Sequence, residues 1–313
     1  MKNSFLLIVI VGLALAAQPA SSQVIRMSYT SRSLNFLPAF VAMEEGFFKR
    51  EGLSVELIQM RSNLGVMALI NNQVDFTLSY GGTLEAALKG WPIKILVVIS
   101  DTPHHLVAGK SYRKVQDLKG KIIGVNRLGG SNEYVIAKVM DHFGIKRDDI
   151  KILALGDEPI RRVAIEQELI AATILSPPEP VLARRSGLNV LLWVGEVVFS
   201  PQSALATTKE KLKRKRDEVK AVVRAMVRGL DFVKKPENKA RVSAFISRYL
   251  AIRKEDAAES LDLMLPALVR DGILEDSKVK MSIEETASRI KLKELPQHEE
   301  IFDFSLVREV LAR

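Results

Sequence analysis

Two series of alternating strand-like and helix-like segments constrain the fold of this chain more than any other feature of its sequence. The first series spans residues 24–99, where short apolar, β-branched runs alternate with segments whose apolar residues repeat at helical spacing. The second series spans residues 121–193 and has the same layout. Because repeated strand–helix units form parallel sheets with right-handed crossovers, we predict an α/β fold with two lobes, each a mostly parallel sheet flanked by helices.

Three local predictions refine this outline. The run at 93–99 is almost continuously apolar and β-branched, which is typical of a parallel strand buried on both faces. Thr83 is expected to cap a helix that ends near Lys89, because threonine is favoured just before a first helical turn. A further helix is expected from Pro38, closed by Gly46.

The pattern changes after residue 204, where only helical spacing remains. Helices are predicted at 211–233, 236–250 and 254–269, followed by a looser tail. We expect this helical tail to pack back on the first lobe, so that the chain crosses between the lobes near 104–108 and 200–206. The predicted division of the chain is 23–104 with 205–313 for lobe 1, and 105–204 for lobe 2.

Residues 1–22 have the three-part layout of a secretory signal peptide. Lys2 provides a positive start, residues 5–17 form an apolar run of 13 residues, and small residues follow at 20–22. The run is shorter than the roughly 20 residues that span a bilayer, although an uncleaved membrane anchor is the alternative interpretation. We expect cleavage near Ser22 and an exported, periplasmic mature chain.

Composition narrows the possible functions mainly by exclusion. Lys and Arg total 46 against 37 Asp and Glu, which gives a net charge of +9. In an exported chain this excess does not point to nucleic acid. The densest basic run, 209–216, leads into a segment with helical spacing and has no interleaved aromatic residues for base stacking. We therefore expect a solvated helix start there and no nucleic-acid partner.

Signatures of catalysis and of bound cofactors are missing from the sequence. There is no cysteine, which excludes disulfides, thiolate metal sites and catalytic thiols. HExxH, GxSxG and P-loop motifs are missing too. His104 and His105 are adjacent, and adjacent side chains of a strand point to opposite faces, so the two cannot easily chelate one ion. We expect no enzymatic activity, no cofactor and no metal.

Ligands of open parallel sheets bind beyond the carboxyl ends of the strands. Five loops that follow predicted strands hold small or polar residues suited to this position: 30–35, 61–63, 79–82, 127–132 and 176–179. The glycines at 129–130 precede a predicted helix, where they let the backbone approach a ligand and the free amides of the first turn favour an anion. An ordinary helix-capping turn is the alternative interpretation.

Arg32, Arg61 and Arg127 lie in three of these loops. Guanidinium groups bind carboxylate, sulfonate or phosphate at two points, so an anionic ligand is our hypothesis. Arginines that face solvent are the alternative, and acidic residues occupy similar positions. Phe36 and Tyr80 also lie at strand ends, where their rings could stack on a ring or an acyl portion of a ligand.

Four stretches, in order along the chain, carry a family resemblance. They are GFFKREGL at 46–53, NQVDFTLSYGG at 72–82, DLKGKIIGV at 117–125 and SPPEP at 176–180. From residue 24 to about 290 the chain resembles substrate-binding proteins of ABC transporters, specifically the nitrate/sulfonate/taurine type, which are similar to the thiamine-pyrimidine-precursor-binding domain. One departure is that Glu168 and Ala171 stand where the family usually has Gly and Asp, which concerns the local turn rather than the fold.

The resemblance implies a two-lobed fold of the type II periplasmic-binding-protein kind. A small solute would bind between the lobes and be delivered to a membrane permease with its ATPase. The solute would be anionic, like a sulfonate, nitrate, taurine or carboxylate, or else pyrimidine-like, and the protein would be a monomer. The matching loops imply ligand contacts from Thr30, Ser31, Asn35, Phe36, Ser62, Asn63, Ser79, Tyr80, Gly81, Gly130, Ser131, Ser176 and Pro177. The basic residues and the helix start described above add Arg32, Arg61, Arg127 and Asn132.

Two other functions fit the same scaffold, because a fold does not determine an activity. One is an exported enzyme of the pyrimidine type, and the other is a sensory or interaction module. The cysteine-rich motif of the fungal pyrimidine-synthesising relatives is missing from this sequence, which disfavours the enzyme.

Overall fold

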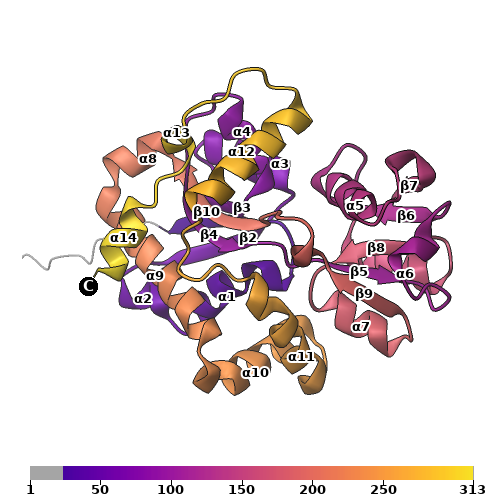
Figure 1. The fold of residues 1–313 in the computed structure, drawn as a ribbon. Helices are drawn as coiled ribbons and strands as arrows, with labels where there is room; N and C mark the ends of the chain where they lie inside the picture. Colours follow the sequence, from indigo (N-terminus) through magenta and orange to yellow (C-terminus); the bar gives the residue numbers. More distant parts are fainter. Residues whose placement is uncertain (1–23, 313) are drawn as a thin grey trace, which may run out of the picture.

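The computed structural model describes residues 24–312 and contains two five-stranded sheets that lie in separate lobes (Figure 1). The first sheet has the strand order β2-β1-β3-β10-β4. Its strands are β1 (Ile25–Tyr29), β2 (Val55–Gln59), β3 (Phe76–Ser79), β4 (Ile93–Ser100) and β10 (Ser203–Thr208). The second sheet has the order β7-β6-β8-β5-β9. Its strands are β5 (His105–Ala108), β6 (Ile122–Val125), β7 (Lys151–Ala154), β8 (Ala172–Leu175) and β9 (Asn189–Trp193).

Each sheet contains one strand that runs against the others. In the first sheet β10 is antiparallel to both of its neighbours, β3 and β4, whereas β1 is parallel to β2 and to β3. In the second sheet β5 is antiparallel to β8 and β9, whereas β6 is parallel to β7 and to β8. The other four strands of each sheet therefore point the same way, which confirms the predicted α/β fold with mostly parallel sheets.

The two reversed strands are β5, with which the chain enters the second sheet, and β10, with which it returns to the first. The chain leaves the first sheet after β4, enters the second with β5, and returns with β10 after β9. It thus passes between the sheets at 101–104 and 194–202, close to the crossings expected from the sequence. The exact division of residues between the lobes stays a prediction.

Two strand predictions were wrong, and both errors concern the reversed strands. β4 is buried on both faces as expected, but its partner is the antiparallel β10, because β10 inserts between β3 and β4. The segment after residue 204 begins with this strand and not with a helix. All six residues of β10 are buried, so its small side chains fill the centre of a sheet.

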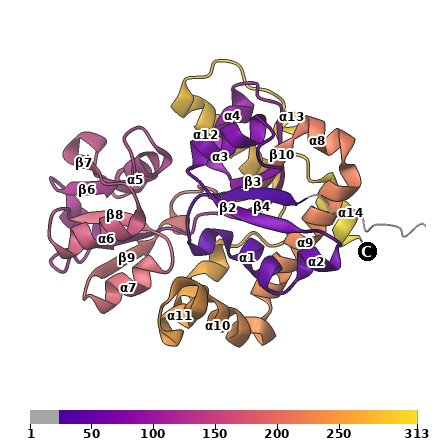
Figure 2. The same cartoon turned by 180° about the vertical axis from the view of Figure 1, so that it is seen from behind.

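Helices of the two strand–helix series connect the parallel strands (Figures 1 and 2). They are α1 (Leu37–Glu44), α2 (Phe47–Arg50), α3 (Ser62–Ile70) and α4 (Gly81–Leu88), then α5 (Ser131–His142), α6 (Glu158–Glu166) and α7 (Glu179–Arg185). Short 3-10 turns are η1 (Leu34–Phe36), η2 (Val115–Leu118), η3 (Arg147–Asp149), η4 (Val194–Glu196), η5 (Pro236–Asn238) and η6 (Leu265–Ala267). Thr83 does not cap α4 as predicted. It lies inside the first turn, and its hydroxyl donates to the Ser79 carbonyl at 2.5 Å.

The C-terminal part of the described chain is helical and covers the first sheet. It comprises α8 (Lys209–Arg214), α9 (Arg216–Lys234), α10 (Lys239–Leu250), α11 (Lys254–Met264), α12 (Asp276–Ile290), α13 (His298–Ile301) and α14 (Ser305–Leu311). The predicted helix at 211–233 is two helices that meet at Lys215. α9 packs on α1, α12 on α4, and α14 on α9, so the tail returns to the first lobe as expected.

The signal peptide predicted at 1–22 lies outside the described residues. Within residues 24–312, no helix combines the length and the apolar character needed to cross a membrane.

The turn after α6 contains Glu168, where the sequence departs from the family pattern. Glu168 has a φ of 59°, in the left-handed region that favours glycine, and it directly follows the last residues of the helix. We expect Glu168→Gly to raise the free energy of unfolding by about 1 kcal/mol, because the side chain pays a steric cost in this conformation.

The matched control is Gln167→Gly, since Gln167 has an ordinary φ of −87°. Glycine there should lower stability by about 0.5–1 kcal/mol. Urea unfolding midpoints check both values, and a loss of stability in Glu168→Gly would contradict the strain.

Candidate functional site

The loops named by the sequence lie at the sides of the two lobes that face each other. α3 and α4 begin after β2 and β3 in the first lobe, and α5 begins after β6 in the second. Both views place α3 opposite α5 (Figures 1 and 2). The candidate site is therefore a set of helix starts and strand ends contributed by both lobes.

In the first lobe the starts of α3 and α4 are held close together. Ser62 is the first residue of α3, and its hydroxyl lies 2.6 Å from the hydroxyl of Ser79 at the end of β3. A Cβ atom at Gly82 would collide with the Ser62 hydroxyl, so glycine permits this approach. No side chain caps either helix. The N–H groups of both first turns, including that of Gly81, therefore point out of the helix ends without a side-chain acceptor. This arrangement suits an anion.

The flanking polar residues of the first lobe are more exposed. Thr30 is half-buried, and the exposed Ser31 donates a hydroxyl hydrogen bond of 3.3 Å to Ser33. Arg61 and Asn63 are exposed at the start of α3. The structure thus places Arg61 beside the Ser62–Ser79 pair without tying it to an acid among residues 24–312.

Arg32 is engaged inside its own lobe. Its guanidinium lies 4.7 Å from the centre of the Tyr249 ring and donates to the Tyr249 carbonyl. It is therefore less available for an anion than the sequence suggested. Asn35 is buried, its carbonyl accepts a 2.6 Å hydrogen bond from Ser203, and its side-chain oxygen has no partner in the described part of the chain.

The two aromatic candidates belong to the hydrophobic core. Phe36 is 2% exposed and packs with Tyr29 and Phe40, with ring centres 6.0 and 6.4 Å away. Tyr80 is 3% exposed and packs on Phe302, and burial raises the pKa of its phenol. Neither ring has the open face that stacking on a ligand would need in this conformation, so that part of the prediction finds no support here.

The second lobe contributes the start of α5. Gly130 occupies the position before the helix, and a Cβ there would press on Arg127 at 2.9 Å from its Cγ. Ser131 is half-buried, Asn132 is buried, and Arg127 is exposed with its guanidinium unpaired by any acid within 24–312. The turn keeps the first amides of α5 and one arginine at the same edge.

The nearby acid of α5 reaches back to the turn before the helix and is paired inside the lobe. Glu133 accepts a hydrogen bond from the Gly129 amide at 2.9 Å and pairs with Arg147 at 2.7 Å. The hydrogen bond from Arg147 lowers the pKa of the Glu133 carboxyl. The charge of Glu133 is therefore compensated within the lobe and opposes an anion only weakly.

Ser176 and Pro177 are fully buried, and Ser176 is already engaged. Its amide and its hydroxyl donate to the carboxylate of Glu158 at 2.8 and 2.7 Å. Burial raises the pKa of Glu158, and the buried Arg161 beside it donates to the Ile174 carbonyl at 3.1 Å. Ser176 thus shapes its loop, and its hydroxyl proton is not available to a ligand while Glu158 holds it.

Glu158 and Arg161 hold the Ser176 loop in place, which the sequence interpretation missed. They lie three positions apart in the first turn of α6, a spacing that brings side chains onto one helix face. That spacing was the available signal. The sequence does not show that the pair turns inward and holds the loop that ends β8.

The two crossing segments are bonded to each other. The Thr102 hydroxyl accepts from the Ser200 amide at 2.7 Å, and the Trp193 indole donates to the Thr102 carbonyl at 2.7 Å. His104 and His105 are buried here, and burial lowers their pKa values to about 3 and about 4. Both imidazoles are therefore neutral at ordinary pH. Within residues 24–312, no three His, Asp or Glu side chains gather as a metal site would need.

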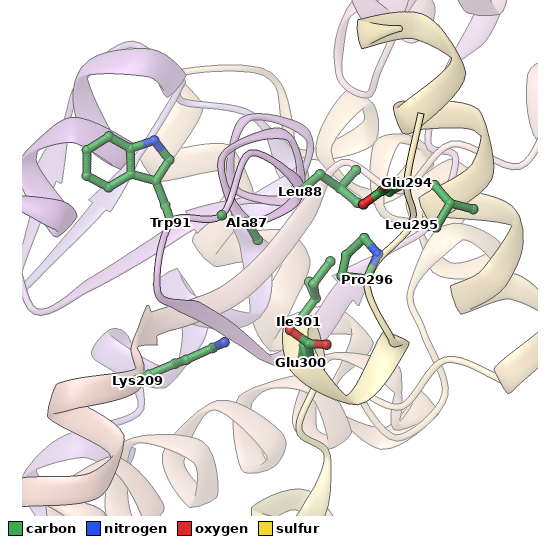
Figure 3. A pocket seen from close by; sticks show the side chains of 10 residues that line it. Ala87, Leu88, Trp91, Lys209, Glu294, Leu295, Pro296, Glu300 and Ile301 are labelled. Atoms are coloured by element: carbon green, nitrogen blue, oxygen red, sulfur yellow. The ribbon is translucent and has the colours of Figure 1, made fainter. Parts of the chain in front are cut away.

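The described residues also border two hollows, the second of which adjoins the loop that holds Arg32. One of about 310 Å³ is bordered by α4 and the segment before α13, and its lining includes Trp91, Lys209 and Glu300 (Figure 3). The other, of about 340 Å³, lies between α1, β2 and α10 and is lined by Phe40 and Tyr249 among others. None of the predicted ligand residues lines either hollow.

Comparison with known proteins establishes the family. Residues 33–240 match the model of the NMT1/THI5-like family, so the chain belongs to that family. The riboflavin-binding protein RibY of Chloroflexus aurantiacus is 26% identical over 68% of this chain. The 4-amino-5-hydroxymethyl-2-methylpyrimidine phosphate synthase THI11 of Saccharomyces cerevisiae is 29% identical over 38% of it. The match spans 63% of the first relative's length and 36% of the second's, so less than two thirds of each.

Solved structures share the whole fold. The aliphatic sulphonate binding protein SsuA of Escherichia coli superposes with a TM-score of 0.72 at 15% identity, covering 90% of this chain and 98% of its own. The nitrate-binding protein NrtA of Synechocystis PCC 6803 gives 0.75 at 13% identity, covering 93% and 89%. The fold is that of the periplasmic binding proteins, and the predicted family resemblance is confirmed.

The buried histidines generate a pH prediction. His104 has a pKa of about 3 in the folded chain against about 6.5 when unfolded, so unfolding takes up a proton below pH 6.5. Stability should be flat above that pH and fall as pH decreases toward 4. At pH 5 this one group should account for about 2 kcal/mol.

His104→Gln removes that titration and should about halve the decline between pH 6.5 and 5, because the buried His105, with a pKa of about 4, contributes a similar share. Chemical unfolding at several pH values measures it. A decline as steep in the variant as in the parent protein would show that proton uptake by His104 on unfolding does not cause the loss of stability.

Proposed function

We propose that this chain is the solute-binding component of an ABC importer, which captures a small anion between its lobes and delivers it to a membrane permease with its ATPase. The observation that carries the proposal is the pairing of uncapped helix starts, α3 with α4 in one lobe and α5 in the other, on sides that face each other. Such ends attract negative charge.

The charges around these helix starts support an anion. Two of the acids nearby are compensated: Glu133 by Arg147, and Glu179 by Arg162 at 2.7 Å. Arg61 and Arg127 remain without an acidic partner in the described chain and lie beside the helix starts. The names of SsuA and NrtA, which bind a sulphonate and nitrate, agree with this chemistry.

A ring-shaped solute is the second candidate. The observation that favours it is that the relatives named by sequence are a riboflavin-binding protein and pyrimidine phosphate synthases. The structure offers less for it, because Phe36 and Tyr80 are buried. We also propose that the chain binds without turnover, since it has no cysteine and most of its structural neighbours are binding proteins.

The proposal includes export to the periplasm and a monomeric protein. The signal peptide would be cleaved near Ser22, which intact-mass measurement of the protein recovered from the periplasm would detect. A monomer suffices, because one set of facing loops comes from a single chain.

A ligand screen tests the anion. Thermal shift and calorimetry are run with nitrate, ethanesulfonate, taurine and acetate, and with riboflavin and a hydroxymethylpyrimidine. An anion at 100 times its dissociation constant should stabilise the protein by about 2.7 kcal/mol. Binding of a ring compound with no response to any anion would contradict the anion and support the second candidate. Conversion of a bound compound into product would contradict a pure binding role.

Two substitutions localise the anion. Arg61→Gln and Arg127→Gln should each weaken its binding about 3- to 10-fold, because each removes a cation beside a helix start. Arg113→Gln is the matched control, since Arg113 is exposed in the second lobe and forms no ion pair within 24–312. Equal losses in all three variants would show a general charge effect and not a site.

A further inference from the structure

α7 of the second lobe packs against α11 of the C-terminal tail, and paired charges join the two helices. Arg184 and Glu259 form an ion pair of 2.6 Å, and Arg185 pairs with Asp256. The Asp256 side chain is only 3% exposed and also accepts from Arg253 at 3.1 Å. We call Arg184, Arg185, Asp256 and Glu259 the α7–α11 clasp.

We propose that the α7–α11 clasp holds the lobes at the separation in which the ligand loops of both lobes meet, and so sets the affinity of the site. The claim that the clasp sets the affinity rests on the proposed function. The claim that the clasp controls the separation of the lobes concerns the protein without ligand.

The clasp is mechanically connected to both ligand loops. α7 begins at Glu179, directly after the loop that holds Ser176 and Pro177. On the other side, Leu34 in the first lobe's ligand loop packs in one apolar cluster with Ala257 and Leu261 of α11. Any shift of α7 along α11 therefore moves one loop relative to the other.

The two loops touch in the clasped arrangement. The Leu34 amide donates to the Pro177 carbonyl at 3.4 Å, across the lobes. On the other flank α5 and α12 approach each other, where burial and the nearby Glu285 carboxylate raise the pKa of the Tyr134 phenol. The arrangement seen here thus brings these two loops into contact, and the clasp favours it by charge attraction.

The expected size of the effect follows from population. When only a fraction of the protein has the binding arrangement, the apparent dissociation constant rises in inverse proportion to that fraction. Exposed ion pairs act weakly, but reversing one charge replaces attraction with repulsion. Arg184 and Glu259 are 44% and 43% exposed, so Arg184→Glu should leave folding intact. We expect it to weaken binding about 3- to 10-fold.

The distance between the lobes tests the clasp without any ligand. Because the chain has no native cysteine, spin labels can be placed at Asn71→Cys after α3 and Asp141→Cys in α5, both exposed. Double electron–electron resonance should give one narrow distance in the parent protein. Arg184→Glu should broaden it toward longer values, and Arg184→Glu with Glu259→Arg should restore it.

Lys239→Glu is the matched control, since Lys239 pairs with Asp262 inside the first lobe at 2.6 Å with similar exposure. It should leave the distance unchanged. Glu259→Gln provides a milder variant if charge reversal impairs folding. Distances that stay at the parent value in both Arg184→Glu and Glu259→Gln would overturn the proposal.

The affinity of the same proteins for ethanesulfonate or nitrate gives the second readout. Arg184→Glu should raise the dissociation constant, and the charge swap should return it to within twofold of the parent value. A changed distance with an unchanged dissociation constant would overturn the link to affinity. If no anion binds the parent protein, the proposed function fails, while the distance measurement still decides the clasp.

Discussion

The insertion of β10 between β3 and β4 is the constraint on which the rest of the architecture depends. This strand returns from the second lobe and lies antiparallel in the buried centre of the first sheet. The hydroxyl of its first residue, Ser203, lies 2.7 Å from the Ser100 hydroxyl and donates a hydrogen bond to the Asn35 carbonyl at 2.6 Å. The place where the chain re-enters the first sheet is thereby tied to the loop that is a candidate for binding ligand.

The crossing segments and the α7–α11 clasp limit how the lobes can move against each other. The two crossing segments share hydrogen bonds through Thr102, so they act together as one connection. The lobes are further linked by the α7–α11 clasp. Motion of one lobe against the other would then be a rotation about the crossings, limited by side chains that lie outside the ligand loops.

The electrostatics of the candidate site come from backbone more than from side chains. Three helices start at the facing sides without side-chain caps, and the nearby carboxylates are held by arginines or by Ser176. Of the three arginines in the loops, Arg32 is held by Tyr249. A helix start carries its partial charge in a fixed direction, so it requires little reorganisation when an anion binds.

Patterns within a few residues predicted the local helices and strands. The sequence did not predict features that depend on contacts between distant segments. The strand–helix alternation and the positions of α5 and α7 follow from spacing within a few residues. β10 looked like the beginning of a helical region, because its small residues SALATT acquire strand geometry only by pairing with β4. Arg32 looked free for the same reason, since Tyr249 lies 217 residues away. Phe36 and Tyr80 do lie in segments that follow strands, as predicted, but both rings pack into the core.

Hydrogen exchange of the backbone amides, with and without the anion that stabilises the protein, tests the central claim most directly. The account predicts slowed exchange in the first turns of α3, α4 and α5, at 62–64, 81–83 and 131–133, from both lobes together. Protection confined to one lobe, or centred on the hollow beside Trp91, would contradict it.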